Sequence, residues 1–232
     1  MIPNLITLLN LFIGCIITLL LIEDNLSISS ISYLILIALF FDFMDGLIAR
    51  KFNMKSKLGA QLDSLAELIS FGLVPGIIMY KLFMEVSLDP YLPFFGFCIT
   101  LASAYRLANF NLITEDLKYF EGLPTPANTI FILSLMLIIT LYNDLFIKQI
   151  ILNNNFLIFI TFLTCYLLNS RIKLINLKFN DFKFKGVNKY RILLIISSSI
   201  LIIVLGWLAI PVILFLYYIL SYFALRLSKK VN

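Results

Sequence analysis

The sequence predicts an all-α fold, a polytopic integral membrane helical bundle with about eight transmembrane helices. Of its 232 residues, 61% are hydrophobic and only 13% are charged, and the mean hydropathy is +1.01. This composition is more apolar than that of ordinary soluble domains. The apolar residues also gather in runs long enough to cross a hydrocarbon layer of ~30 Å at ~1.5 Å per helical residue. We therefore expect a single transmembrane domain over residues 1–232.

Eight apolar runs define the expected helices. They cover residues 5–22, 29–48, 62–84, 91–113, 127–143, 149–168, 191–205 and 207–225. The first run has neither a basic leader nor an A-x-A-like cleavage site, so we predict a retained helix rather than a signal peptide. The first six runs form the expected core, and the last two a carboxy-terminal pair. Gly206-Trp207 between them is either the tip of a tight hairpin or the middle of one long helix.

Basic residues divide unequally between the two ends of these helices. With the amino terminus in the cytoplasm, every Lys and Arg except Lys81 and Lys148 falls on the cytoplasmic side, which is the pattern of the positive-inside rule. The basic connection at 170–190 has two interpretations. It is a surface attracted to anionic lipid headgroups, at ~1 kcal/mol per basic residue, or a loop that only sets orientation. Nothing in the charge pattern indicates binding to nucleic acid.

Four carboxylates lie beside or inside the apolar runs. Ionisable groups at membrane depth are costly, so such a cluster predicts a functional site that faces a polar cavity. Asp42 and Asp45 are three residues apart, so they project from one helix face. Asp63 and Glu67 are four apart and do the same. Two opposed faces of this kind would form a cage of hard oxygen ligands for Mg²⁺, Mn²⁺ or Ca²⁺, and the chain has no His to suggest a softer metal.

Small residues and a cation keep fixed distances from these acids. The pattern reads Asp42-x-x-Asp45-Gly46-x-x-Ala49-Arg50, eight residues, Gly59, three residues, Asp63, three residues, Glu67. It resembles the signature of the CDP-alcohol phosphatidyltransferases, which end in a fourth Asp. Three further stretches are similar to the serine-accepting subgroup from bacteria and archaea. They are Pro3 to Gly14, Leu62 to Pro75 and Phe120 to Ala127.

The resemblance implies an enzyme of phospholipid biosynthesis. It would transfer the phosphatidyl group of CDP-diacylglycerol to the hydroxyl of L-serine, giving phosphatidylserine and CMP without a covalent intermediate. The protein would be a homodimer in the cytoplasmic membrane of a bacterium or archaeon, with its active site facing the cytoplasm. Asp42, Asp45 and Asp63 would hold two divalent ions, Mg²⁺ or Mn²⁺, against the pyrophosphate. Glu67 would add a metal ligand and act as the general base, so Asp63 and Glu67 are the candidate catalytic residues.

The resemblance also marks candidate substrate-binding residues. These are Asn4, Thr7, Gly46, Ala49, Arg50, Gly59, Ser64, Arg106, Gly122 and Pro124. The small residues among them would border the cytidine and the phosphates. Arg106 is the candidate for the serine carboxylate, because a guanidinium binds a carboxylate through two parallel hydrogen bonds. An Arg that only anchors the helix at the headgroups remains an alternative. For Gly122 and Pro124 the alternative is a plain turn before the next helix.

Two positions depart from the family pattern. Glu67 carries one methylene more than Asp, and a displacement of about 1 Å at a reacting group can cost on the order of 100-fold in rate. Asn109 stands where the subgroup has an Arg. These departures leave open an active enzyme, a slow one, or a non-catalytic lipid-binding relative. Glycerol 3-phosphate or inositol remains an alternative acceptor. A cation transporter is the alternative of another class, although acids grouped at the cytoplasmic helix ends favour lipid chemistry.

Overall fold

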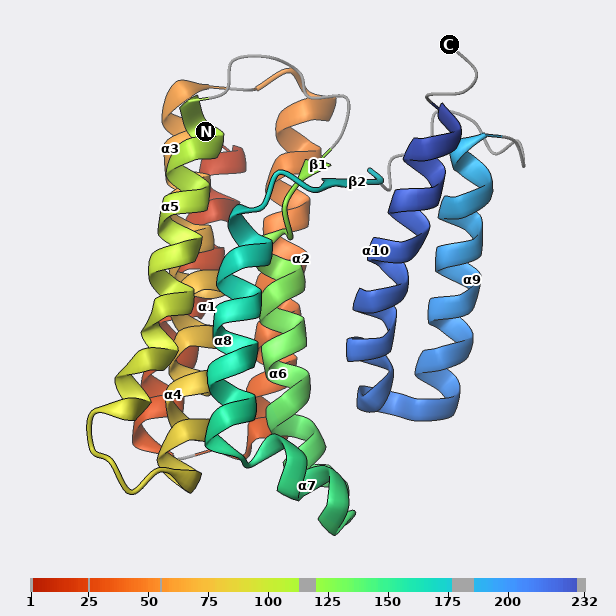
Figure 1. Cartoon of the computed structure of the whole chain (residues 1–232). Coiled ribbons are helices and arrows are strands. Elements are labelled where there is room, and N and C mark those ends of the chain that lie inside the picture. Colours follow the sequence, from red (N-terminus) through yellow and green to blue (C-terminus); the bar gives the residue numbers. More distant parts are fainter. Residues whose placement is uncertain (1, 25, 55, 113–119, 177–185, 229–232) are drawn as a thin grey trace. The chain divides into compact units, whose positions relative to one another are not determined.

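The chain folds into antiparallel helices with one short pair of strands (Figure 1). The computed structural model describes residues 2–24, 26–54, 56–112, 120–176 and 186–228. Its helices and strands are α1 Ile2–Glu23, α2 Ile28–Lys51, α3 Lys57–Leu68, η1 Ile69–Leu73, α4 Val74–Val86, η2 Leu92–Phe97, α5 Cys98–Leu112, β1 Phe120–Glu121, α6 Thr125–Leu141, α7 Leu145–Ile151, α8 Asn154–Asn169, β2 Lys173–Leu174, α9 Val187–Leu205, η3 Gly206–Leu208 and α10 Ala209–Ser228.

The helices belong to two compact units. Unit 1 contains residues 1–114 and 124–168, and unit 2 contains residues 115–123 and 169–232. Unit 1 therefore holds α1 to α8 and all four carboxylates singled out above. The single domain expected over residues 1–232 stays a prediction, and each unit is described by itself.

Side-chain caps define where two helices of unit 1 begin. The Ser27 hydroxyl accepts the N–H of Ser30 (3.3 Å) before α2. The Ser56 hydroxyl accepts the N–H of Gly59 (2.9 Å) before α3. Such caps satisfy backbone donors that the first helical turn leaves without partners. They fix the starting residues of the two helices that carry the acids.

A π-helical segment, η1, joins α3 to α4. The Ser70 hydroxyl donates to the carbonyl of Asn10 in α1 (3.1 Å). A Cβ added to Gly14 would lie 2.4 Å from the Ser70 Oγ, so α1 approaches this segment as closely as a residue without a side chain allows. Single π turns inside helices are frequent at functional sites. Here the π turn begins two residues after Glu67.

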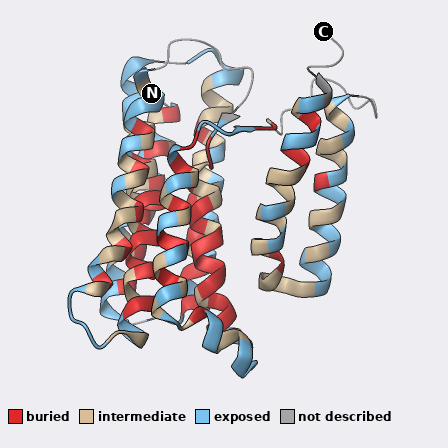
Figure 2. Cartoon of the chain, in the orientation of Figure 1, coloured by how far each residue is buried: buried red, intermediate tan, exposed pale blue. Residues whose placement is uncertain are grey.

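The apolar core of unit 1 surrounds α4. Phe71, Ile78, Met79, Leu82 and Phe83 are completely buried. Helix α4 packs against η2 on one side and α6 on another, and Figure 2 shows the buried residues gathered between the helices of this unit. Close packing of this kind forms a scaffold with little freedom to move. It holds α1, α3 and α6 in register beside the acids.

The helices confirm an all-α polytopic membrane protein. Four described stretches are long and apolar enough to cross a membrane, namely Ile2–Glu23, Ile28–Lys51, Lys57–Val86 and Val187–Arg226. The bent pair α7 and α8, at 61°, raises the number to five. The expected number of about eight spans stays a prediction, because this criterion counts α9 and α10 together as the one stretch Val187–Arg226 and sets α6 apart as a shorter apolar helix. Helix α5 has 15 residues and α6 has 17, which is at or below the length that a span requires.

Unit 2 contains a helical hairpin. Gly206, with φ +57°, ends α9, and α10 then returns antiparallel to it (Figure 1). The structure thus favours the hairpin over one long helix for these residues. Ile175, Leu194, Leu220 and Ala224 form its small buried cluster. Strand β2, which pairs antiparallel with β1, leads into this cluster.

Candidate active site

The two acidic pairs lie at matching depths in α2 and α3. Counted at ~1.5 Å per residue from the end of α2, Asp45 lies ~9 Å deep and Asp42 ~14 Å deep. Counted from the start of α3, Asp63 lies ~9 Å deep and Glu67 ~15 Å deep. A short connection joins the two helices, and α1 packs against both of them. Asp45 should therefore lie level with Asp63, and Asp42 level with Glu67.

Electrostatic interactions connect the four acids across the two helices, and among the acids Asp45 is the one that acts on Glu67. Among the acids, Glu67 acts most strongly on Asp42, and Asp45 acts most strongly on Asp63. The structure thus brings all four predicted acids together, and we refer to Asp42, Asp45, Asp63 and Glu67 as the four-carboxylate site. Asp45 is only 4% exposed. Four buried or half-buried acids within reach of one another are costly unless cations or hydrogen bonds compensate them.

Helix α1 holds the α2 pair by hydrogen bonds. The Thr7 hydroxyl donates to Asp45 Oδ2 (2.6 Å), and the Asn10 amide donates to Asp42 Oδ1 (3.3 Å). Thr7 was expected to bind substrate, and its hydroxyl contacts a motif acid. Asn10 was not among the candidate site residues. Its signal was periodicity, because Pro3, Thr7, Asn10 and Gly14 lie on the buried face of α1.

Helix α6 and helix α5 hold Glu67. The Thr125 hydroxyl donates a hydrogen bond to Glu67 Oε1, and the Arg106 guanidinium interacts electrostatically with the same carboxylate. Arg106 therefore lies within reach of the site, as expected for a substrate ligand. Thr125 was missed by sequence reasoning. It sits between Pro124 and Pro126 in a stretch that resembles the serine-accepting subgroup, of which only Gly122 and Pro124 were named as site candidates.

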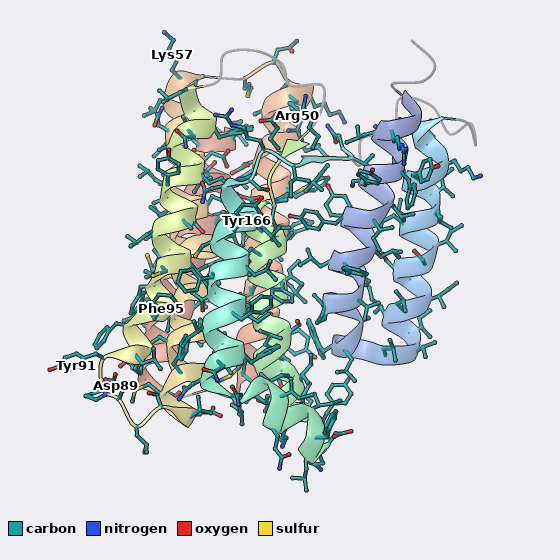
Figure 3. The ribbon with its side chains drawn as sticks, in the orientation of Figure 1. Arg50, Lys57, Asp89, Tyr91, Phe95 and Tyr166 are labelled. Carbon is teal, nitrogen blue, oxygen red and sulfur yellow. The ribbon has the colours of Figure 1, made fainter. Side chains whose placement is uncertain are left out.

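Arg50 is the cation nearest to the other two acids. It interacts electrostatically with Asp45 and with Asp63. A Cβ added to Gly46 would lie 3.3 Å from the Arg50 Nη1, so this glycine leaves room for the guanidinium. Figure 3 shows Arg50 and Lys57 at the same end of unit 1. The end of unit 1 from which the depths of the four acids were counted is therefore basic.

The other predicted substrate residues take several positions. A Cβ on Gly59 would lie 3.1 Å from Asn4 Oδ1, so Asn4 lies against the start of α3. Asn111 of α5 donates to the Ser64 hydroxyl (2.9 Å), which ties α3 to α5. Ala49 lies half-buried in the last turn of α2.

The loop residues before α6 fall in different units. Gly122, with φ +70°, belongs to unit 2, where its N–H donates to the carbonyl of Ile172 (3.0 Å). Pro124 belongs to unit 1 and immediately precedes Thr125, the partner of Glu67. Of these two candidates, only Pro124 is next in the sequence to a residue that contacts the four-carboxylate site.

The donor set suits a hard divalent cation. Within the described ranges, no group of three or more His, Cys, Asp or Glu side chains is arranged to hold one metal ion. The oxygen chemistry still fits Mg²⁺ or Mn²⁺, which bind carboxylates and keep several waters or substrate oxygens as ligands. Asn10 Oδ1 adds a buried oxygen that has no hydrogen-bond partner among the described residues. Metal binding at this site stays a prediction.

Comparison with known proteins places these features in one family. The model of the CDP-alcohol phosphatidyltransferase family matches residues 1–167. The chain is 38% identical over 113 residues to the CDP-diacylglycerol–serine O-phosphatidyltransferase of Saccharomyces cerevisiae, covering 44% of this chain and 40% of that protein. It is 36% identical over 137 residues to the archaetidylserine synthase of Methanothermobacter thermautotrophicus, covering 58% and 57%.

A bacterial relative gives a similar result. The chain is 35% identical over 129 residues to the CDP-diacylglycerol–serine O-phosphatidyltransferase of Bacillus subtilis, covering 54% of this chain and 69% of that protein. The chain thus spans between 40% and 69% of the length of these three relatives. The family match ends near the carboxy-terminal boundary of unit 1, and α9 and α10 lie beyond it.

Proposed function

Because the chain belongs to the CDP-alcohol phosphatidyltransferase family, we propose that it transfers the phosphatidyl group of CDP-diacylglycerol to the hydroxyl of L-serine. The products are phosphatidylserine and CMP. The observation that carries this proposal is the four-carboxylate site, in which two acidic pairs lie at matching depth beside α1. The names of the relatives support the choice of serine, because two of those described above are serine transferases that use CDP-diacylglycerol.

Glu67 is the proposed general base. Its carboxylate accepts the proton of the serine hydroxyl while the serine oxygen forms a bond to the phosphorus that carries the diacylglycerol. The bond from that phosphorus to the CMP oxygen breaks, and CMP leaves. Thr125 fixes one oxygen of Glu67 by its hydrogen bond, so the other oxygen stays available for the proton. Arg106 interacts electrostatically with Glu67 and is the proposed ligand of the serine carboxylate.

Asp42, Asp45 and Asp63 are the proposed metal ligands, with Glu67 beside them. A bound Mg²⁺ or Mn²⁺ would supply positive charge to the pyrophosphate oxygens as the leaving group gains electrons. Thr7 and Asn10 orient two of these acids from α1. Outer hydrogen bonds of this kind commonly fix the direction of a ligand oxygen.

The basic end of unit 1 is the proposed cytoplasmic side. The site lies ~9 to ~15 Å from the helix ends, so an acyl chain in the membrane and a nucleotide in water could reach it together. Arg50 at this end interacts with two motif acids, and it can also meet a phosphate. We further propose a homodimer in the cytoplasmic membrane of a bacterium or archaeon, as the family resemblance implies.

The test is CMP release by the purified full-length protein from CDP-diacylglycerol in the presence of Mg²⁺ or Mn²⁺. L-serine, glycerol 3-phosphate and inositol are supplied in parallel. Serine-dependent release is the expected result. Release with another acceptor alone would keep the family and change the substrate. If CMP is released with none of the three acceptors, the result would favour a non-catalytic lipid-binding protein or a transporter. Cys98→Ala, at a half-buried position that no step uses, is the control for handling and folding.

A further inference from the structure

Helix α6 contains a buried amide with no visible partner. Asn128 is 0% exposed, and neither its Oδ1 nor its Nδ2 has a hydrogen-bond partner among the residues that the structure describes. Burying an amide is costly unless it is hydrogen-bonded. Most buried polar side-chain atoms in proteins have a partner. The partner of this amide is therefore a group other than the described side chains, either an ordered water or a ligand.

The neighbouring polar side chains of α6 are all satisfied. Thr125 donates to Glu67. Thr129 has the carbonyl of Phe71 within hydrogen-bond distance (3.0 Å), and Ser134 donates to the carbonyl of Phe131 (2.6 Å). The sequence thus supplies partners for hydroxyls before and after Asn128 on the same helix. Asn128 is therefore the exception among these side chains, and its lack of a partner does not come from a general shortage of hydrogen-bonding groups along α6.

Asn128 lies beside the residues that carry the proposed chemistry. It follows Thr125 by three residues, which is ~4.5 Å along the helix axis. Helix α6 packs against α2, which carries Asp42 and Asp45, and against η1, which begins two residues after Glu67. The amide is therefore within about one helical turn of the residue that holds the proposed base.

The chemistry of the amide selects a class of ligand. A carboxamide offers two N–H donors and one oxygen acceptor and carries no charge. The amino-acid end of serine offers the complement, a carboxylate that accepts and an ammonium that donates. A neutral partner can bind both groups without adding a fifth negative charge beside the acids. A simple alcohol or a phosphate monoester has no ammonium, so its only donor to the amide oxygen is a hydroxyl.

We propose that Asn128 binds the amino-acid end of the acceptor and thereby sets the preference for a zwitterionic substrate. This proposal rests on the proposed function, since it assumes that serine is the acceptor. Asn128 does not take part in the transfer step. It determines which acceptor is held beside Glu67.

The experiment compares Asn128→Leu with the wild-type protein at saturating CDP-diacylglycerol. The KM for L-serine should rise about 10- to 100-fold, as expected for lost hydrogen bonds to charged groups. The KM for CDP-diacylglycerol should stay unchanged. The Tm should stay unchanged or rise, because an apolar side chain of similar shape replaces a buried amide. Ethanolamine lacks the carboxylate, so its KM should rise much less than the KM for serine. The ratio of kcat/KM for serine to kcat/KM for ethanolamine should therefore fall.

Two further variants keep the test decisive. Asn128→Asp has the same shape but repels the serine carboxylate, so the serine KM should rise by at least as much. Asn154→Leu is the matched control, because its Oδ1 is also buried without a partner among the described residues. Asn154 begins α8, after the end of α6 and the whole of α7, whereas Thr125 begins α6. Asn154→Leu should therefore leave the serine KM unchanged.

The outcomes separate this proposal from the proposed function. If the wild-type protein releases no CMP with serine, the proposed function fails before any variant is compared. If it does release CMP, a serine KM unchanged in both Asn128 variants overturns the present inference alone. A lowered Tm with unchanged serine KM would assign Asn128 to packing and would equally overturn it.

Discussion

The two acidic pairs of the four-carboxylate site are held in different ways. Asp42 and Asp45 receive hydrogen bonds from α1, the nearest helix in the sequence. Glu67 receives its hydrogen bond from Thr125, 58 residues later in the chain. The first pair is thus held by the preceding helix, through donors 38 and 32 residues away, whereas the second depends on the packing of α6 against η1. We infer that the α2 pair forms a robust ligand platform and that the α3 pair is the tuned part of the site.

The largest expected effect is the loss of a charge from the α3 pair. Asp63→Asn removes a carboxylate that interacts with Asp45, Glu67 and Arg50 and keeps the side-chain shape. Removal of one preorganised electrostatic contact costs about 100- to 1,000-fold in rate. CMP release with serine should fall by that factor, and metal-dependent binding of CDP-diacylglycerol should weaken. Unchanged turnover in Asp63→Asn would overturn the assignment of the site.

The next effect concerns the length of residue 67. Glu67→Asp restores the family residue but withdraws the carboxylate by one methylene, so the hydrogen bond from Thr125 should be lost. A displacement of about 1 Å costs on the order of 100-fold, and we expect a loss of 10- to 100-fold in kcat with little change in the KM for serine. The measurement is CMP release over a series of serine concentrations. A faster Glu67→Asp would mean that the native Glu is a handicap and that Thr125 does not compensate for it.

The sequence predicted the α2 pair and the α3 pair because both follow from spacing within one helix. Three and four residues place side chains on one face regardless of tertiary structure. The start of α2 at Ile28 lies within one residue of the expected run, whereas α3 begins at Lys57, five residues before the run expected at 62–84, because the cap residue Ser56 was not used. What spacing could not give is which distant helix completes the site.

Thr125 and Asn128 illustrate that limit. Both lie in a run that reads as a turn followed by an apolar helix, and neither forms a charged motif. Their relation to Glu67 arises only when α6 packs beside η1. The sequence alone does not decide the number of spans, for a related reason. Apolar runs mark buried helices as well as membrane spans, and α6, with its many completely buried residues, is too short for the criterion that the longer helices meet.

A smaller effect is expected at the hydroxyl that holds Glu67. Thr125→Ala removes one hydrogen bond to a carboxylate, worth about 1.5 kcal/mol or more, and about tenfold in rate. Thr125→Ser keeps the hydroxyl and should restore most of the activity. The expected loss is in kcat, because Thr125 positions the base and does not contact the substrate. Equal losses in Thr125→Ala and Thr125→Ser would point to packing of the methyl group instead.

The smallest effect is expected at the matching hydroxyl of the α2 pair. Thr7→Val keeps the shape of the side chain and removes the hydrogen bond to Asp45. Asp45 also faces Arg50 and accepts a hydrogen bond from the backbone of Gly46, so its position is supported from more than one side. We expect the rate to fall about threefold, which is less than the loss of one hydrogen bond at its full net strength would cause. The concentration of Mg²⁺ or Mn²⁺ that gives half-maximal activity should rise. A loss in Thr7→Val as large as that in Thr125→Ala would remove the distinction between a robust pair and a tuned one.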